Sequence, residues 1–185
     1  MTEIAGTAVR KKLDGIVFAL SQVLRKERLG TGPLAQLRRM DPLGVPPPAF
    51  WPLFFEVVDP EAKGESTERA WAIIVQAMAM MGPEAHQGGR RAGRALADSG
   101  YPEGRFVRLL RGSGEALATE VRTLSRWCLA KGLGFDWTDL AALILARQAG
   151  DPERADRAVL RLARSYFQPA APTVVTETAL AGDEA

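Results

Sequence analysis

Apolar residues recur along most of the chain at the three- and four-residue spacing that places them on one face of a helix. In the first such segment Leu13, Val17 and Leu24 share a face. Strand patterns, in which apolar and polar residues alternate and β-branched side chains are common, are nearly absent. The pattern predicts helices at residues 8–29, 34–40, 49–58, 66–81, 90–98, 102–111, 115–130, 136–149 and 152–167.

Proline, glycine and capping residues separate the predicted helices. Residues 41–48 hold four prolines and a glycine, and residues 82–89 are rich in glycine, so we expect a loop in both places. Asp136 is a suitable N-cap with Asp139 three residues later, in the spacing of a capping box. Pro152 suits the first turn of the last helix.

These elements predict an all-α protein, a compact bundle of about eight or nine helices. A length of 185 residues suits one domain or two small ones. We expect one helical domain over residues 1–168, with a division into two helical halves near 82–89 as the alternative. Residues 169–185 are rich in proline, threonine and alanine and carry three acidic residues and no base, so we predict a disordered acidic tail.

The composition, 46% hydrophobic and 25% charged, is typical of a globular protein with a core. The distribution of charge is more informative. Without the predicted tail the chain holds 24 basic against 19 acidic residues, and 19 of the bases are arginines. The planar guanidinium group of arginine binds two phosphate oxygens at once, which lysine cannot do. A GC-rich or heat-adapted source would also give an arginine-rich sequence, and both explanations can hold together.

Residues suited to catalysis or to metal binding are few. His86 is the only histidine and Cys128 the only cysteine, so a zinc site with about four Cys or His ligands and an internal disulfide are both excluded. Cys128 lies among leucines in a predicted helix, which favours a buried, unreactive thiol. No glycine-rich phosphate loop follows a strand. We therefore expect neither enzymatic activity nor a cofactor.

The chain shows no targeting or membrane segment. Residues 1–6 lack the basic start and apolar run of a signal peptide. The most apolar stretch, residues 71–81, is shorter than the roughly 20 residues that a membrane-spanning helix needs, so we interpret it as a core helix. We expect a cytoplasmic protein that does not contact a membrane.

Arginines recur at helical spacing opposite the apolar faces. In the last predicted helix they step by three, four and three residues, which forms a ridge along one exposed face. Several such ridges, without carboxylates interleaved on the same stripe, predict a track for a nucleic-acid backbone. The arginines concerned are Arg154, Arg157, Arg161 and Arg164 in that helix, Arg122 and Arg126 at 115–130, and Arg105 and Arg108 at 102–111.

Two ordinary roles compete with this interpretation. Basic residues near the C-terminal end of a helix offset the helix dipole, which would account for Arg25, Arg28 and Arg38 without a ligand. Exposed arginines also form ion pairs, and Asp151 and Glu153 lie near the last ridge. For any single arginine the ordinary roles are favoured, so the nucleic-acid hypothesis rests on the whole set.

Several segments, in their order and spacing, resemble the CasB family, the small subunit of the type I-E CRISPR surveillance complex called Cascade. The resemblance covers the chain from about Gly32 to Phe167. The segments that carry it are 34–39 (LAQLRR), 50–51 (FW), 93–97 (GRALA), 105–111 (RFVRLLR), 121–126 (VRTLSR), 136–140 (DWTDL) and 164–167 (RSYF).

The resemblance implies a non-catalytic, all-helical subunit that pairs head to tail with a second copy. It also implies contact with other Cascade subunits, with CRISPR guide RNA and target DNA as a hybrid, and with the displaced DNA strand. In RNA-guided recognition, base pairing reads the sequence while protein reads the backbone and its shape. The segments and the last ridge together give these candidate nucleic-acid contacts: Arg38, Arg39, Arg105, Arg108, Arg111, Arg122, Arg126, Arg157, Arg161 and Arg164.

The alternative is a helical scaffold or adaptor whose arginines bind acidic protein surfaces. The aromatic segment 50–55 and the proline-rich loop before it would then form a docking surface instead of core. The sequence leaves open which arginines contact nucleic acid and which hold helices or partner subunits together.

Overall fold

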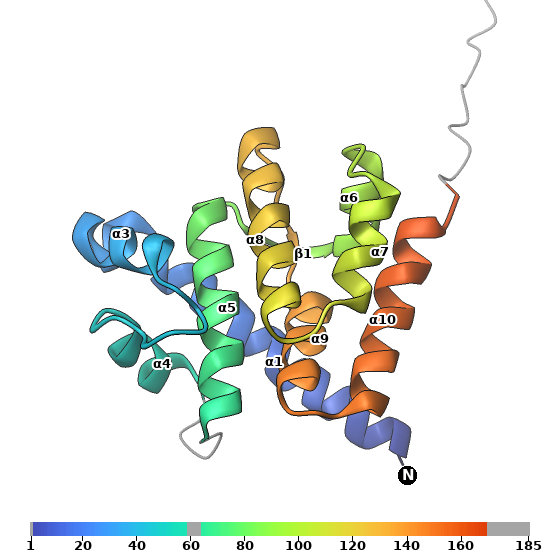
Figure 1. Cartoon of the computed structure of the whole chain (residues 1–185), viewed down its shortest axis with the longest axis horizontal. Helices are drawn as coiled ribbons and strands as arrows, with labels where there is room; N and C mark the ends of the chain where they lie inside the picture. Colours follow the sequence, from blue (N-terminus) through green and yellow to red (C-terminus); the bar gives the residue numbers. More distant parts are fainter. Residues whose placement is uncertain (1, 59–63, 170–185) are drawn as a thin grey trace, which may run out of the picture.

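The computed structural model describes residues 2–58 and 64–169 and contains, within them, ten helices and one small sheet, which confirms the all-α prediction (Figure 1). The predicted tail, from residue 170 onward, lies outside the described residues. The helices are α1 (Thr2–Val23), α2 (Lys26–Leu29), α3 (Thr31–Arg39), α4 (Phe50–Val57), α5 (Glu65–Met81), α6 (Ala92–Asp98), α7 (Glu103–Arg111), α8 (Gly114–Lys131), α9 (Thr138–Gln148) and α10 (Pro152–Phe167). The strands are β1 (His86–Arg91) and β2 (Phe135–Asp136).

Helix α5 lies at the centre of the core because it is apolar on all sides. Every residue from 70 to 79 is buried, including the polar Gln76. The amide of Gln76 donates to the carbonyl oxygen of Met40, so its polar group is not left unsatisfied. Helices α3, α8 and α9 pack against α5, and Figure 1 shows α5 standing between α3 and α8.

Helix α10 covers one side of the bundle, against α6 and α9. Its start is set locally, since Asp151 Oδ1 accepts the backbone N–H of Arg154 at 3.0 Å and a proline occupies the first position. Ala155, Ala158 and Leu162 form its buried stripe. The arginine ridge therefore lies on the outer face of a helix that is packed along its whole length.

The small sheet is absent from the sequence prediction. The pattern predicts a loop at 82–89 and a helix that starts at residue 90, whereas β1 occupies residues 86–91 and α6 begins only at Ala92. β1 runs parallel to β2, with His86 opposite Phe135 and Arg91 opposite Asp136. The pairing partner lies far along the chain and β1 contains two glycines and two arginines, so no local strand signal exists.

Helices from both sides of residues 82–89 contribute to one continuous hydrophobic core. Helix α1 reaches across to α9 and β1, while α5 packs on α8 and α9. The long first helix of the prediction is divided after Val23, and α2 is a separate single turn. The number of domains stays a prediction. Within residues 2–58 and 64–169, no helix combines the length and apolar character needed to cross a membrane.

Candidate nucleic-acid interface

The ten arginines predicted to contact nucleic acid fall into two groups in the structure. One group is held by hydrogen bonds or ion pairs from other parts of the protein, and it comprises Arg38, Arg108, Arg122, Arg157 and Arg161. The other group makes no hydrogen bond or ion pair to any described residue, and it comprises Arg39, Arg105, Arg111, Arg126 and Arg164.

The tightest of the held arginines is Arg161, which joins two helices. Its Nε lies 2.6 Å from Oδ1 of Asp139 in α9, and the Asp139 side chain is only 13% exposed. A carboxylate therefore lies beside the ridge, although none is interleaved with the arginines on the stripe of α10 itself. This carboxylate comes from a neighbouring helix, which the sequence pattern of α10 alone cannot reveal. Arg161 is committed to packing α10 on α9.

Two further arginines form exposed ion pairs. Arg108 Nε lies 3.1 Å from Oε1 of Glu120, which links α7 to α8, and Arg157 Nη1 lies 3.7 Å from Oε2 of Glu153 one turn earlier in α10. Pairs of this kind contribute about 0–1 kcal/mol to stability. A phosphate group can therefore compete with these carboxylates for either guanidinium.

The other two held arginines bind neutral groups near the middle of the bundle. Arg38 Nε donates to the carbonyl oxygen of Ala79 at 2.8 Å, which fastens the end of α3 to the last turns of α5. Arg122 Nη2 donates to Oε1 of Gln76 at 3.4 Å, across the interface of α8 and α5. Neither bond neutralises the positive charge, so both arginines still attract an anion.

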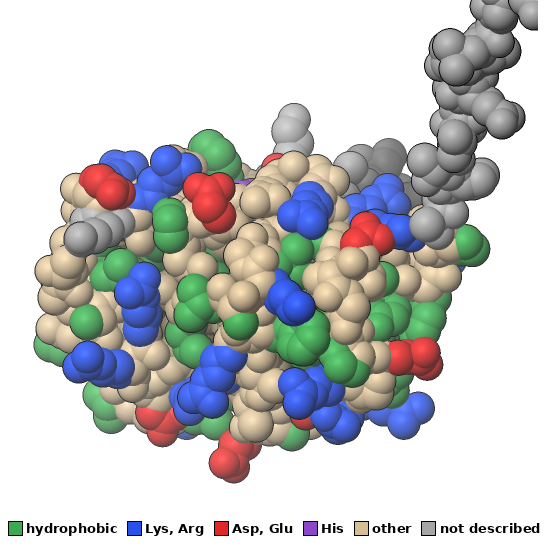
Figure 2. All heavy atoms as spheres, turned by 90° about the horizontal axis from the view of Figure 1, so that it is seen from above, with side chains coloured by type: hydrophobic (Ala, Val, Ile, Leu, Met, Phe, Trp, Pro, Cys, Tyr) green, Lys and Arg blue, Asp and Glu red, His purple; other side chains and the backbone are tan. Residues whose placement is uncertain are grey.

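All five arginines without partners are exposed, and they belong to α3, α7, α8 and α10. Figure 2 shows the molecule from above, with Lys and Arg side chains spread over this face among hydrophobic ones and most acidic side chains toward its edge. An exposed guanidinium has five N–H donors in a planar fork, which suits a phosphate oxygen pair. These five arginines can therefore bind a polyanion without breaking internal contacts.

Sequence reasoning missed two exposed arginines, Arg90 and Arg91 in β1. The sequence pattern predicts a helix from residue 90, so it gives these two arginines no place in an arginine ridge. A signal was available: they follow two glycines directly, and residues 85–97 contain no acidic side chain. Arg94 in the same stretch is different, because Asp98 and the carbonyl oxygen of Gln168 hold its guanidinium.

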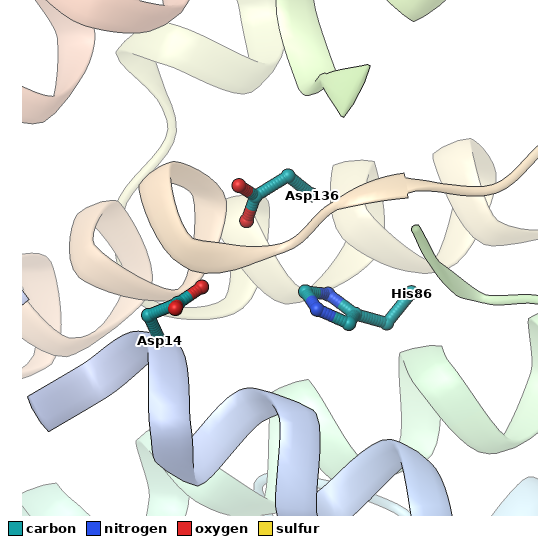
Figure 3. Close-up of side chains that lie close together, drawn as sticks. All are labelled: Asp14, His86 and Asp136. Carbon is teal, nitrogen blue, oxygen red and sulfur yellow. The ribbon is translucent and has the colours of Figure 1, made fainter. Parts of the chain in front are cut away.

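The structure also brings together three chemically active side chains that the sequence separates widely, Asp14, His86 and Asp136 (Figure 3). One oxygen of each carboxylate and one ring nitrogen all lie within 4.8 Å of one another. His86 Nδ1 accepts the backbone N–H of Trp137 at 3.3 Å. Burial lowers the pKa of His86, and the nearby Asp136 and Asp14 raise it by less.

Two carboxylates and an imidazole are a ligand set that could hold a divalent cation. A histidine bound to metal through one nitrogen normally donates a proton from the other. Here His86 Nδ1 is an acceptor, so the neutral ring carries its proton on Nε2. Asp14 and Asp136 each accept a hydrogen bond from Thr138. The arrangement fits a hydrogen-bonded cluster that fixes α1 against the start of α9 better than it fits a metal site.

The only thiol, Cys128, is buried in α8, as predicted. Burial raises its pKa to about 12, so it is protonated near neutral pH and is a poor nucleophile. Its place in the core gives it a packing role.

Comparison with known proteins points to one family. A model of the family described as CRISPR-associated protein Cse2 matches residues 33–167. Among solved structures, the fold is similar to the crystal structure of CasB from Thermobifida fusca, with a TM-score of 0.64, 20% identity, and coverage of 85% of this chain and 97% of that chain. At this identity the likeness shows a shared fold. No curated protein sequence matched the chain.

Proposed function

The chain belongs to the CRISPR-associated Cse2 family, and on that basis we propose that it is the non-catalytic small subunit of an RNA-guided Cascade complex. In this role it holds the backbones of the guide RNA–target DNA hybrid and of the displaced DNA strand. The observation that carries the proposal is the group of exposed arginines without partners among the described residues, on α3, α7, α8 and α10.

The charge arrangement supports backbone binding over base reading. Arginines spread over several helices can contact successive phosphates, and phosphate contacts fix position without reading sequence. An RNA-guided complex needs this division, because the guide supplies the sequence. Arg39, Arg105, Arg111, Arg126 and Arg164 are the primary contacts in this proposal. Arg108 and Arg157 join them by exchanging weak ion pairs for phosphate.

The proposal that the chain is non-catalytic is supported by the surroundings of its two candidate reactive side chains, Cys128 and His86. Cys128 is buried, and burial raises its pKa to about 12. His86 Nδ1 is occupied by the Trp137 N–H. Within the described residues, neither group is available as a nucleophile or a general base in an open cavity.

Contact with other subunits, and pairing with a second copy, are part of the same proposal. The aromatic segment of α4 is divided in the structure, since Phe50 and Phe54 are buried while Phe55 is 58% exposed and stacks on the half-buried Trp51. An exposed stacked aromatic pair suits a protein contact. It is also the observation that favours the alternative, an adaptor whose basic faces bind acidic proteins.

A binding measurement at several salt concentrations tests the proposal. The full chain is titrated into labelled single-stranded DNA and into an RNA–DNA hybrid between 50 and 200 mM NaCl. We expect sequence-independent binding that weakens linearly on a log–log plot, with a slope of about −0.7 to −0.9 for each phosphate bound. No binding at 50 mM NaCl, or binding independent of salt, would contradict the proposal. Binding of an acidic protein instead would support the adaptor.

A further inference from the structure

Residues Gln87–Arg90 form an exposed arch in β1. The strand meets β2 only at its ends, where His86 lies opposite Phe135 and Arg91 lies opposite Asp136. Because Phe135 and Asp136 are adjacent, the four residues between the two pairing points have no counterpart on β2 and bulge from the sheet. From Gly88 to Arg91 every residue is exposed.

The two glycines of the arch differ in whether the backbone conformation requires a glycine. Gly89 has a φ of +78°, in the region that favours glycine. Gly88 has no such requirement, because its φ is not positive and a Cβ added there would meet no atom within 4 Å. Local structure does not explain a glycine at residue 88. The missing side chain means that no Cβ at residue 88 shields the neighbouring backbone from a ligand, and backbone N–H groups can bind phosphate.

The arch region also carries two positive charges, on Arg90 and Arg91, that form no ion pair with a described acid, although Asp136 is the strand partner of Arg91. Arg90 Nη1 donates only to the neutral Oε1 of Gln87, at 3.2 Å. Arg91 makes no hydrogen bond or ion pair to any residue that the structure describes. In contrast, Arg94 is held by Asp98 and Gln168. The charges of Arg90 and Arg91 are therefore available to an anion.

The arch is connected to the surface already described through the end of α8. Gln87 lies against Gly134, where an added Cβ would come 2.9 Å from Gln87 Nε2. Gly134 follows α8, which ends at Lys131. The three residues from Lys131 to Gly134 span at most about 10 Å. The five residues from Lys131 back to Arg126 within α8 add about 7.5 Å. One nucleic-acid strand a few nucleotides long can therefore reach from the arch to Arg126.

From these observations we infer that the arch Gln87–Arg90, together with Arg91, is a phosphate-binding site for a nucleic-acid backbone. The backbone N–H groups at Gly88 and Gly89 bind one phosphate, and the guanidinium groups of Arg90 and Arg91 bind its neighbours. This inference rests on the proposed function and extends it to a segment outside the helical arginine ridges. The ligand is a phosphodiester chain, bound without regard to its bases.

Two double variants of the full chain test the arginines. Arg90→Ala/Arg91→Ala removes the two charges of the site. Arg69→Ala/Arg94→Ala is the matched control, since it removes the same charge from arginines outside the ridges that are paired with Glu65 and Asp98. Binding of a labelled single-stranded DNA is measured by fluorescence anisotropy between 50 and 200 mM NaCl. Loss of both guanidinium groups from phosphate lowers the magnitude of the salt slope by about 1.4. Between 50 and 200 mM NaCl, the factor by which the variant loses affinity should therefore be about sevenfold smaller than the factor for wild type. The control keeps the wild-type slope.

A third variant tests access to the backbone without changing charge. Gly88→Val adds a side chain where space is open and suits a strand, so circular dichroism and melting should match wild type. We expect DNA affinity at 50 mM NaCl to fall several-fold because the branched side chain covers the N–H groups. Gly15→Val is the control, since Gly15 is exposed on α1 and also has open space around it.

The outcomes separate this inference from the proposed function. If the wild-type chain does not bind nucleic acid, the proposed function fails and the arch fails with it. If the wild type binds and both arch variants behave like their controls, the arch inference is overturned while the proposed function stands. If the arch variants keep DNA binding but no longer assemble with other subunits of the complex, the arch is a protein contact, which also overturns the inference.

Discussion

Arg161 in α10 forms an ion pair with Asp139 in α9, with 2.6 Å between Nε and Oδ1. One turn further along the same ridge, Arg164 makes no hydrogen bond or ion pair to a described residue. Two arginines with the same place in the sequence pattern therefore have different roles. Arg161 holds two helices together, and Arg164 is free for a ligand outside the chain.

Replacement of Arg161 by alanine should destabilise the protein. It leaves the mostly buried Asp139 carboxylate without this partner, so the free energy of unfolding should fall by about 1–2 kcal/mol, between values for exposed and fully buried pairs. In a chain of this size that corresponds to a melting temperature lower by roughly 2–8 °C. A double-mutant cycle with Asp139→Asn should give a coupling energy clearly above zero. Purely additive effects would show that the pair is not a stabilising contact.

Replacement of Arg126 and Arg164 by alanine should weaken nucleic-acid binding and leave the stability of the fold unchanged. Neither side chain has a partner in the described structure, so the melting temperature should stay within about 1 °C of wild type. Nucleic-acid binding should weaken at 50 mM NaCl, and the salt slope should become shallower by about 0.7 for each arginine that no longer binds a phosphate. Arg69→Ala/Arg94→Ala serves as the charge-matched control. Unchanged affinity in the Arg126→Ala/Arg164→Ala variant would remove these residues from the interface.

The different roles within one ridge show what the sequence could predict. Helical spacing correctly places the arginines of α10 on its outer face, because the apolar stripe of Ala155, Ala158 and Leu162 is local information. The partner of Arg161 lies on another helix, so the pairing is long-range information that no single segment contains. Replacing Arg157, Arg161 and Arg164 together by alanine would lower both stability and nucleic-acid binding, so such a variant could not separate the two roles.

Long-range pairing also explains the two structural features that the sequence does not predict. The β1–β2 contact and the cluster of Asp14, His86 and Asp136 join segments that are far apart in sequence. No periodicity marks them, and the residues at β1 are typical of a turn. The helices were predictable because each one carries its own apolar face, its own cap or its own stop signal.

The thiol of Cys128 should be unreactive in the folded protein. The side chain is buried, and burial raises its pKa to about 12, so little thiolate exists at pH 8. A disulfide exchange reagent should label it only after unfolding in guanidinium chloride, when one equivalent should react within minutes. Rapid labelling with a native circular dichroism spectrum would place Cys128 in a segment that opens easily.

The stability of the fold should decrease when the pH falls below about 6.5. Burial lowers the pKa of His86 in the folded state, and the opposing effects of Asp136 and Asp14 are smaller. The unfolded chain, with a histidine pKa near 6.5, then binds the proton more readily than the folded chain. Stability gained from the neutral ring is present at pH 7.5 and is lost as pH falls through 6.5 toward the folded pKa.

A variant separates His86 from other titrating groups. His86→Gln should flatten the change in urea midpoint between pH 7.5 and 5.5, a range above the usual pKa of carboxylates. An NMR titration of the single imidazole should show a pKa below 6.5. A value above 6.5 would mean that Asp14 and Asp136 outweigh burial, and stability should then increase as the pH falls.

The contact of α6 with α10 should not tolerate a side chain at residue 93. A Cβ on Gly93 would lie 2.3 Å from the carbonyl oxygen of Leu162 and 2.7 Å from the backbone nitrogen of Tyr166. Backbone atoms cannot rotate away as a flexible side chain can, so Gly93→Ala must push the helices apart. We expect a loss of about 3 kcal/mol, the upper part of the range for overpacked sites, and a melting temperature lower by roughly 6–12 °C.

Gly104→Ala in α7 provides the matched control for this substitution. Gly104 is also helical, but a Cβ there would meet no atom within 4 Å. Alanine favours the helix over glycine by up to about 1 kcal/mol, so this variant should melt at or slightly above the wild-type temperature. Equal melting temperatures for both variants would show that α6 can move off α10 freely. Because Arg94 beside Gly93 bonds to Gln168 after α10, such movement would also release Arg94 to the surface.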